Sequence, residues 1–194
     1  MDPPLIPWLV RTLPLVVGIG FLWGLLEGTF FFIVPDVFLT LLVPWSVRAA
    51  LLAWAASMLG SLLAVRLLFG WMTLDPGGLV ALITALPGIS LAMVQSVADS
   101  MALDGLPWSL GLVAAGIPLK VYAVAAASVK VPLGTMLPWT LFARVVRIAP
   151  VLLLALAVKT LAGEDPRRHP HRWFWGVLLA WAGFYGFYFQ RMGW

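Results

Sequence analysis

Residues 26–39, LEGTFFFIVPDVFL, place two carboxylates inside an otherwise apolar tract. Glu27 and Asp36 are the only charged residues between Arg11 and Arg48. An uncompensated Asp at the centre of a membrane helix costs roughly 2.5–3.5 kcal/mol even on the lenient insertion scales. A chain that keeps two such groups nine residues apart is therefore expected to give them partners, water, protons or a task.

The composition predicts an integral membrane protein. The chain of 194 residues is 62% hydrophobic and only 10% charged, and its mean hydropathy is +1.02. Ordinary soluble domains carry about 25% charged residues, so this chain lacks the polar surface to cover a soluble globule. Its apolar runs are continuous and rich in Leu and Ala, which favours helices over a membrane barrel.

Charge and cysteine usage narrow the classes of partner. The net charge of +4 suits contact with anionic lipid head groups, and nucleic acid is a poor partner for so apolar a chain. Cysteine is absent, which excludes a thiol nucleophile and a thiolate metal site. His169 and His171 do not predict a metal site, since Pro170 separates them and no third soft ligand is near. No cofactor is expected.

The tract that contains the two carboxylates is predicted to break. Residues 12–47 cover 36 positions, and one straight helix of that length would run ~54 Å, against a hydrocarbon core of ~30 Å. The better fit is a descending helix, a break at Phe31–Pro35 and a short limb that returns to Pro44-Trp45. Pro35 supports the break because it lacks an N–H donor and disfavours helical geometry at Val34.

The remaining chain predicts further spans and a second break. The expected features are a span over Arg48–Trp71 with small packing residues at 55–57 and 60–61, an apolar run over 76–98 interrupted at Pro87-Gly88, a turn over Asp99–Asp104, a second break at Gly116–Pro118, and one tilted span over Val131–Val158.

The chain is expected to form one main membrane domain with short flanking parts. These are an interfacial lead-in over residues 1–11, a membrane domain over 12–160, a basic loop over 161–172 and a C-terminal transmembrane helix over 173–194. Because the positive-inside rule counts Lys and Arg, the basic loop is expected to be cytoplasmic.

A weak internal repeat links the two breaks. Pro35 is followed by the acid Asp36, and Pro118 is followed two positions later by the base Lys120. Paired broken segments in two halves are the sequence pointer to an inverted-repeat transporter with a site at the bilayer midplane. The predicted fold class is an all-α polytopic membrane protein with two re-entrant hairpins in an inverted repeat, plus several transmembrane helices.

Three segments in order resemble the DedA (VTT-domain) family of membrane proteins, in its shorter bacterial branch. Leu26–Phe32 with Pro35–Val37 looks like the first re-entrant motif, and Ile117–Ala126 looks like the second hairpin. Residues 143–147, ARVVR, resemble the Gly-Arg-x-x-Arg element that follows it. The similarity covers roughly residues 20–160. The chain departs from the pattern at residues 31–33, where the family usually has more prolines, and at residue 143, where glycine is common.

The resemblance implies a multi-pass protein of the bacterial inner membrane that translocates lipids and is not an enzyme. Family members are linked to the return of undecaprenyl phosphate or phosphatidylethanolamine across that membrane, eukaryotic relatives are similar to scramblases, and dependence on the proton gradient is often inferred. The partners implied are membrane lipids with anionic phosphate head groups, and protons. A homo-oligomer is left open.

Five charged residues form the candidate site. Glu27 and Asp36 are interpreted as a proton-coupling pair, because ionisable groups inside a membrane are functional hypotheses by default. Lys120, Arg144 and Arg147 are interpreted as ligands for a phosphate head group, since arginine forks match phosphate oxygens. Three alternatives stay open. The charges could form structural ion pairs, the protein could exchange small ions or small solutes for protons, or it could be a membrane scaffold that transports nothing.

Overall fold

The computed structural model describes residues 5–109 and 116–192, which form α-helices and no strands. The helices are α1 (Leu5–Leu9), α2 (Leu13–Thr29), α3 (Asp36–Leu42), α4 (Val47–Leu74), α5 (Pro76–Thr84), α6 (Leu91–Asp104), α8 (Leu119–Ser128), α9 (Leu133–Ala162) and α10 (Pro170–Met192). The all-helical prediction is confirmed. Residues 1–4 of the expected lead-in and residues 193–194 of the expected last helix lie outside the described residues.

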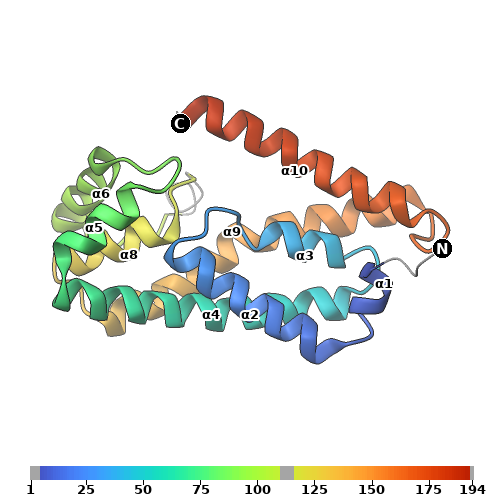
Figure 1. The fold of residues 1–194 in the computed structure, drawn as a ribbon, viewed down its shortest axis with the longest axis horizontal. Helices are drawn as coiled ribbons and strands as arrows, with labels where there is room; N and C mark the ends of the chain where they lie inside the picture. Colours follow the sequence, from blue (N-terminus) through green and yellow to red (C-terminus); the bar gives the residue numbers. More distant parts are fainter. Residues whose placement is uncertain (1–4, 110–115, 193–194) are drawn as a thin grey trace.

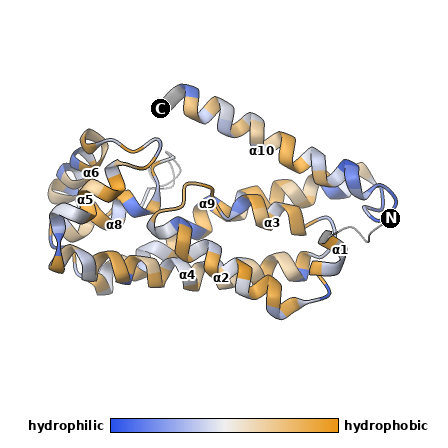
Figure 2. Ribbon diagram, viewed as in Figure 1, coloured by the Kyte–Doolittle hydropathy of each residue, from blue (hydrophilic) through white to orange (hydrophobic). Residues whose placement is uncertain are grey.

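Two of these helices, α4 and α9, are long and apolar enough to cross a membrane. At about 1.5 Å per residue they extend ~42 Å and ~45 Å, more than the ~30 Å of a hydrocarbon core. Both run along the length of the molecule (Figure 1), and hydrophobic residues predominate along them (Figure 2). The predicted spans at Arg48–Trp71 and Val131–Val158 therefore correspond to single helices.

Helices α2 and α4 pack so closely that glycine is required at the contact. A Cβ atom on Gly24 would overlap the backbone oxygen of Ser57, and one on Gly60 would overlap the backbone oxygen of Phe21. Ser61 Oγ also reaches across and lies 3.4 Å from the carbonyl oxygen of Gly24. Of the small residues predicted for the packing face, Ala56, Ser57, Gly60 and Ser61 are buried, whereas Ala55 is exposed on the other side of the helix.

Replacing Gly24 by Ala should destabilise the protein by about 1–3 kcal/mol, because the new methyl group would push α2 away from α4. The thermal unfolding midpoint in detergent measures this effect. Gly18 is the matched control, since it lies on the same helix and a Cβ there would meet no atom within 4 Å. Gly18→Ala should be neutral or stabilising, because Ala is the better helix former. Equal midpoints for the two variants would contradict this contact.

The predicted break in the first tract is confirmed. Helix α2 ends at Thr29 and α3 begins at Asp36, and the chain reverses its direction along the molecule between them (Figure 1). Every residue of α3 from Asp36 to Leu42 is buried. Helix α8, in the second half of the chain, is likewise short, and all its residues from Leu119 to Ala126 are buried. Whether the two short helices belong to re-entrant hairpins is a further prediction.

The second half contains the other interruptions. Helix α5 ends at Thr84, before Pro87-Gly88, and α6 begins after Ser90, whose hydroxyl accepts a hydrogen bond from the Met93 N–H. The expected turn at Asp99–Asp104 is wrong, since these residues form the last part of α6. The helix continues because Val94, Val97 and Met101 bury one face, and it stops at Gly105, whose φ is 75°.

The C-terminal part consists of α10 and the loop before it. Helix α9 continues to Ala162 and stops at Gly163, which has φ of 62°, and α10 begins at Pro170. The connection is therefore shorter than the basic loop expected over 161–172. Helix α10 packs against α3 and runs beside the rest of the molecule (Figure 1). Its crossing of a membrane stays a prediction.

Candidate functional site

Four of the five predicted site residues are buried, although each carries an ionisable group. Glu27, Lys120 and Arg144 are 2% exposed and Asp36 is 1% exposed. They come from α2, α8, α9 and α3, so four different helices each contribute one charged side chain. Buried charges require partners or a function, because removing an ion from water costs several kcal/mol.

One buried ion pair joins two helices that are far apart in the sequence of the predicted membrane domain. The Arg144 Nη2 atom donates to Glu27 Oε2, across 117 positions of sequence. The Nε and Nη1 atoms of Arg144 have no hydrogen-bond partner among residues 5–109 and 116–192. For Glu27 and Arg144, this contact matches the structural alternative: the pair ties α2 to α9.

The irregular backbone between α2 and α3 is held by side chains from three helices. Lys120 Nζ donates to the Phe31 carbonyl at 3.1 Å, and Trp23 Nε1 donates to the Ile33 carbonyl at 2.9 Å. The hydroxyl oxygen of Tyr185 accepts from the Val34 N–H at 2.8 Å. A break at membrane depth is tolerated only where protein or water satisfies the freed backbone groups. These three contacts explain why the chain can leave the helix here.

The carboxylate of Asp36 forms neither an ion pair nor a hydrogen bond among the described residues. Asp36 lies in the first turn of α3, and neither of its carboxylate oxygens has a hydrogen-bond partner in the part of the chain that the structure describes. Arg147, one turn beyond Arg144 on α9, is the cation that acts most strongly on Asp36 through the electrostatic field. Within the described residues the side chain of Arg147 forms no ion pair or hydrogen bond. An acid and a base thus lie within electrostatic range without a direct contact.

A cavity of about 860 Å³ connects these groups. Glu27, Asp36, Lys120 and Arg147 all line it, and Arg144 is linked to it through Glu27. The five residues predicted from the sequence therefore converge. The cluster combines three cations with two carboxylates. The Arg144–Glu27 pair leaves Arg147 and Asp36 without a direct partner among the described residues, and Lys120, which holds the Phe31 carbonyl, lines the same cavity. This arrangement can hold an anion beside a carboxylate.

The sequence reasoning missed the contribution of α10. Trp181 Nε1 donates to Thr40 Oγ1 at 2.9 Å, and the Tyr188 hydroxyl donates to the Gly116 carbonyl at 3.5 Å. Together with Tyr185, these residues line the cavity. Positions 181, 185 and 188 share one helix face, and aromatic residues with a polar group along such a face were the available signal.

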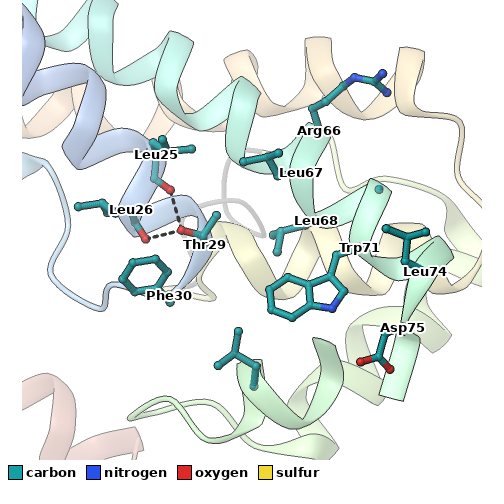
Figure 3. A pocket seen from close by; sticks show the side chains of 12 residues that line it. Leu25, Leu26, Thr29, Phe30, Arg66, Leu67, Leu68, Trp71, Leu74 and Asp75 are labelled. Carbon is teal, nitrogen blue, oxygen red and sulfur yellow. Dashed lines mark hydrogen bonds between the residues drawn. The ribbon is translucent and has the colours of Figure 1, made fainter. Parts of the chain in front are cut away.

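A second cavity, of about 830 Å³, lies between α2, α4 and α5. Its lining is mostly aliphatic and aromatic, and Figure 3 shows Leu25, Leu67 and Trp71 around it, while the guanidinium of Arg66 points away. It contains none of the five predicted site residues, so it is not the candidate site.

Comparisons with known proteins identify no relative of this chain. No protein-family model matches the chain, and no curated protein or solved structure matches it. Within the described residues no group of three or more His, Asp or Glu could hold a metal ion. The buried charges and the cavity that joins them are therefore the features that bear on function.

Proposed function

We propose that the protein is a transporter of the DedA type that moves lipids with an anionic head group across a membrane. The observation that carries the proposal is one cavity lined by Asp36, Arg147 and Lys120, where neither the carboxylate nor the guanidinium has a direct partner among the described residues. A purely structural cluster would pair its charges. Undecaprenyl phosphate and phospholipids are the substrates that the resemblance favours.

The cations divide their roles in this proposal. Arg147 presents a free guanidinium fork to the cavity, and such forks bind phosphate oxygens in pairs. Lys120 adds a point charge while it also holds the Phe31 carbonyl. Arg144 is already bound to Glu27, so it holds the site together and adds its positive field to that of Arg147.

Asp36 is the proposed proton-coupling group. Its carboxylate is buried without a hydrogen-bond donor, so the protonated form needs no rearrangement of partners. Glu27 is less suited to this role because a proton on Glu27 would break its ion pair with Arg144. The two acids of residues 26–39 thus receive different roles: Asp36 couples transport to protons, and Glu27 holds α2 to α9 through Arg144.

Two short helices support the proposal of re-entrant hairpins in an inverted repeat. Helices α3 and α8 have 7 and 10 residues. At about 1.5 Å per residue they extend ~10 Å and ~15 Å, too little to cross a hydrocarbon core of ~30 Å. They lie toward opposite ends of the long helices (Figure 1) and both begin directly after a proline.

The proposed setting is the bacterial inner membrane, which the chain would cross several times. Two apolar helices of sufficient length support membrane insertion. The loop between α9 and α10 carries Arg167 and Arg168, and Arg172 follows in the first turn of α10. The positive-inside rule therefore favours a cytoplasmic position for this loop.

Proteoliposomes with a fluorescent anionic phospholipid in one leaflet test the proposal. Wild-type protein should accelerate its movement to the other leaflet. Arg147→Gln should slow this movement about tenfold or more, because hydrogen bonds to charged groups contribute ~1.5–3 kcal/mol. Arg66→Gln is the matched control, since Arg66 lies outside the charged cavity and should retain the wild-type rate.

The same vesicles separate the alternatives. If the wild-type protein leaves lipid movement at the protein-free rate, the proposal is wrong. Dissipation of a pH gradient that requires a particular small ion and no lipid substrate would identify an exchanger. A scaffold would show neither activity, and paired swaps such as Asp36→Lys with Lys120→Asp would then preserve its phenotype.

A further inference from the structure

The charged cavity continues into an apolar region between α9 and α10. On α9 its lining extends from Arg147 through Val151 and Ala155 to Val158, and α10 contributes Val177, which also packs against α3, and Ala180. The stretch from Arg147 to Val158 covers about 16 Å along the helix axis. One cavity therefore has a buried charged cluster at one end and an elongated apolar stretch beside α9 and α10, with Glu164 and Arg172 lining it beyond that stretch.

The apolar end is open to the surroundings of the protein. Asp36 and Lys120 at the charged end are at most 2% exposed, whereas Leu154, on the α9 side of the apolar stretch, is 66% exposed. Helix α10 packs against α3, where Trp181 bonds to Thr40. Residues of both α9 and α10 line the cavity beside this contact. A long apolar group can enter sideways there and keep its polar end at Arg147.

We infer that the apolar part of the cavity is a binding site for the hydrocarbon chain of a phosphate-bearing amphiphile. We call this part, lined by Val151, Ala155, Val158, Val177 and Ala180, the seam between α9 and α10. The inference rests on the proposed function, and it adds that the chain is held by the protein and does not stay in the bilayer. Charge complementarity selects the occupant: the guanidinium of Arg147 and the ammonium of Lys120 at the closed end attract the phosphate, and the mostly apolar lining accepts the chain. The seam is also the route by which the head group reaches the charged end.

Photolabelling tests the site directly. The probe is phosphatidic acid with a diazirine at the end of one acyl chain, in liposomes that contain the full-length protein. Mass spectrometry should locate label on partly buried lining residues, such as Val151 and Val177, and unlabelled phosphatidic acid should compete. A diacylglycerol with the same reactive chain is the matched ligand control, and it should label only exposed residues outside the cavity, such as Leu153 and Leu179.

Tryptophan substitutions provide matched protein controls. Ala155→Trp and Ala180→Trp fill the seam from opposite helices and should remove most of the labelling at Val151 and Val177. Ala157→Trp and Ala182→Trp lie two positions away on the same helices, outside the cavity lining, and should retain it. Thermal unfolding identifies any variant that fails to fold. If one of the two filling variants fails, loss or retention of labelling in the other filling variant decides whether the seam is the site.

The outcomes separate this inference from the proposed function. Labelling is an equilibrium measurement and requires no transport. Specific labelling of the seam without lipid movement would retain the tail site and refute the transporter. Lipid movement with label only on Leu153, Leu179 and similar residues, or equal labelling by diacylglycerol, would retain the transporter and refute the tail site.

Discussion

Replacing Arg144 by Gln should destabilise the protein by about 3–5 kcal/mol, the range found when one partner of a buried ion pair is removed. The change leaves Glu27 as a charged carboxylate that is 2% exposed and has lost its partner. Glu27→Gln should have an effect of similar size, because Arg144 already has two unpartnered nitrogen atoms and would lose its one acceptor. Unfolding midpoints in detergent measure both changes.

The double variant decides whether the ion pair itself causes the loss. Glu27→Gln combined with Arg144→Gln removes both charges, so it should be more stable than either single variant. Arg147→Gln is the matched control on the same helix face, since it breaks no ion pair within the described residues and should change the midpoint little. Additive losses in the double variant would show that the two side chains do not stabilise each other.

Replacing Asp36 by Asn should have the opposite pattern: full stability and loss of function. Neither oxygen of Asp36 has a hydrogen-bond partner, so the substitution breaks no contact and removes a buried charge. The unfolding midpoint should stay at the wild-type value or rise. Lipid movement driven by a pH gradient should fall to the level of protein-free liposomes, because Asn cannot take up and release a proton.

Asp99 provides the control for this second prediction. It is an exposed carboxylate on α6, away from the charged cavity, and Asp99→Asn should retain both stability and transport. Wild-type transport by Asp36→Asn would refute the coupling role. A marked fall in its stability would assign Asp36 to the structural alternative. The contrast between Asp36 and Glu27 is the sharpest test of the division of roles, since both belong to the same short tract.

Much of the secondary structure followed from local chemistry. The break at Phe31–Pro35 was predictable because Pro35 cannot donate a backbone hydrogen bond and the tract is too long for one span. The close packing of α2 on α4 was predictable from the small residues at 55–57 and 60–61. The turn expected at Asp99–Asp104 was wrong, since two acidic residues in an apolar chain resemble a boundary. Burial of Val97 and Met101 on one face keeps these residues helical.

The cavity depended on contacts that no local pattern encodes. Tyr185 meets Val34 across 151 positions, and Trp181 meets Thr40 across 141. In the sequence, α10 has the composition of an ordinary apolar segment with many aromatic residues. Its lining role depends on which face it turns toward α3 and α9, and this orientation is a property of helix packing.

The sequence by itself determined that the chain is helical and apolar, that its first tract breaks, and which five ionisable residues require an explanation. Helix length, proline chemistry and the cost of buried charge act locally, so they can be recognised in the chain. Only the tertiary structure decided that Arg144 binds Glu27 while Asp36 stays unpaired. Three cations could have paired with either acid, and the choice among them depends on how α2, α3 and α9 pack.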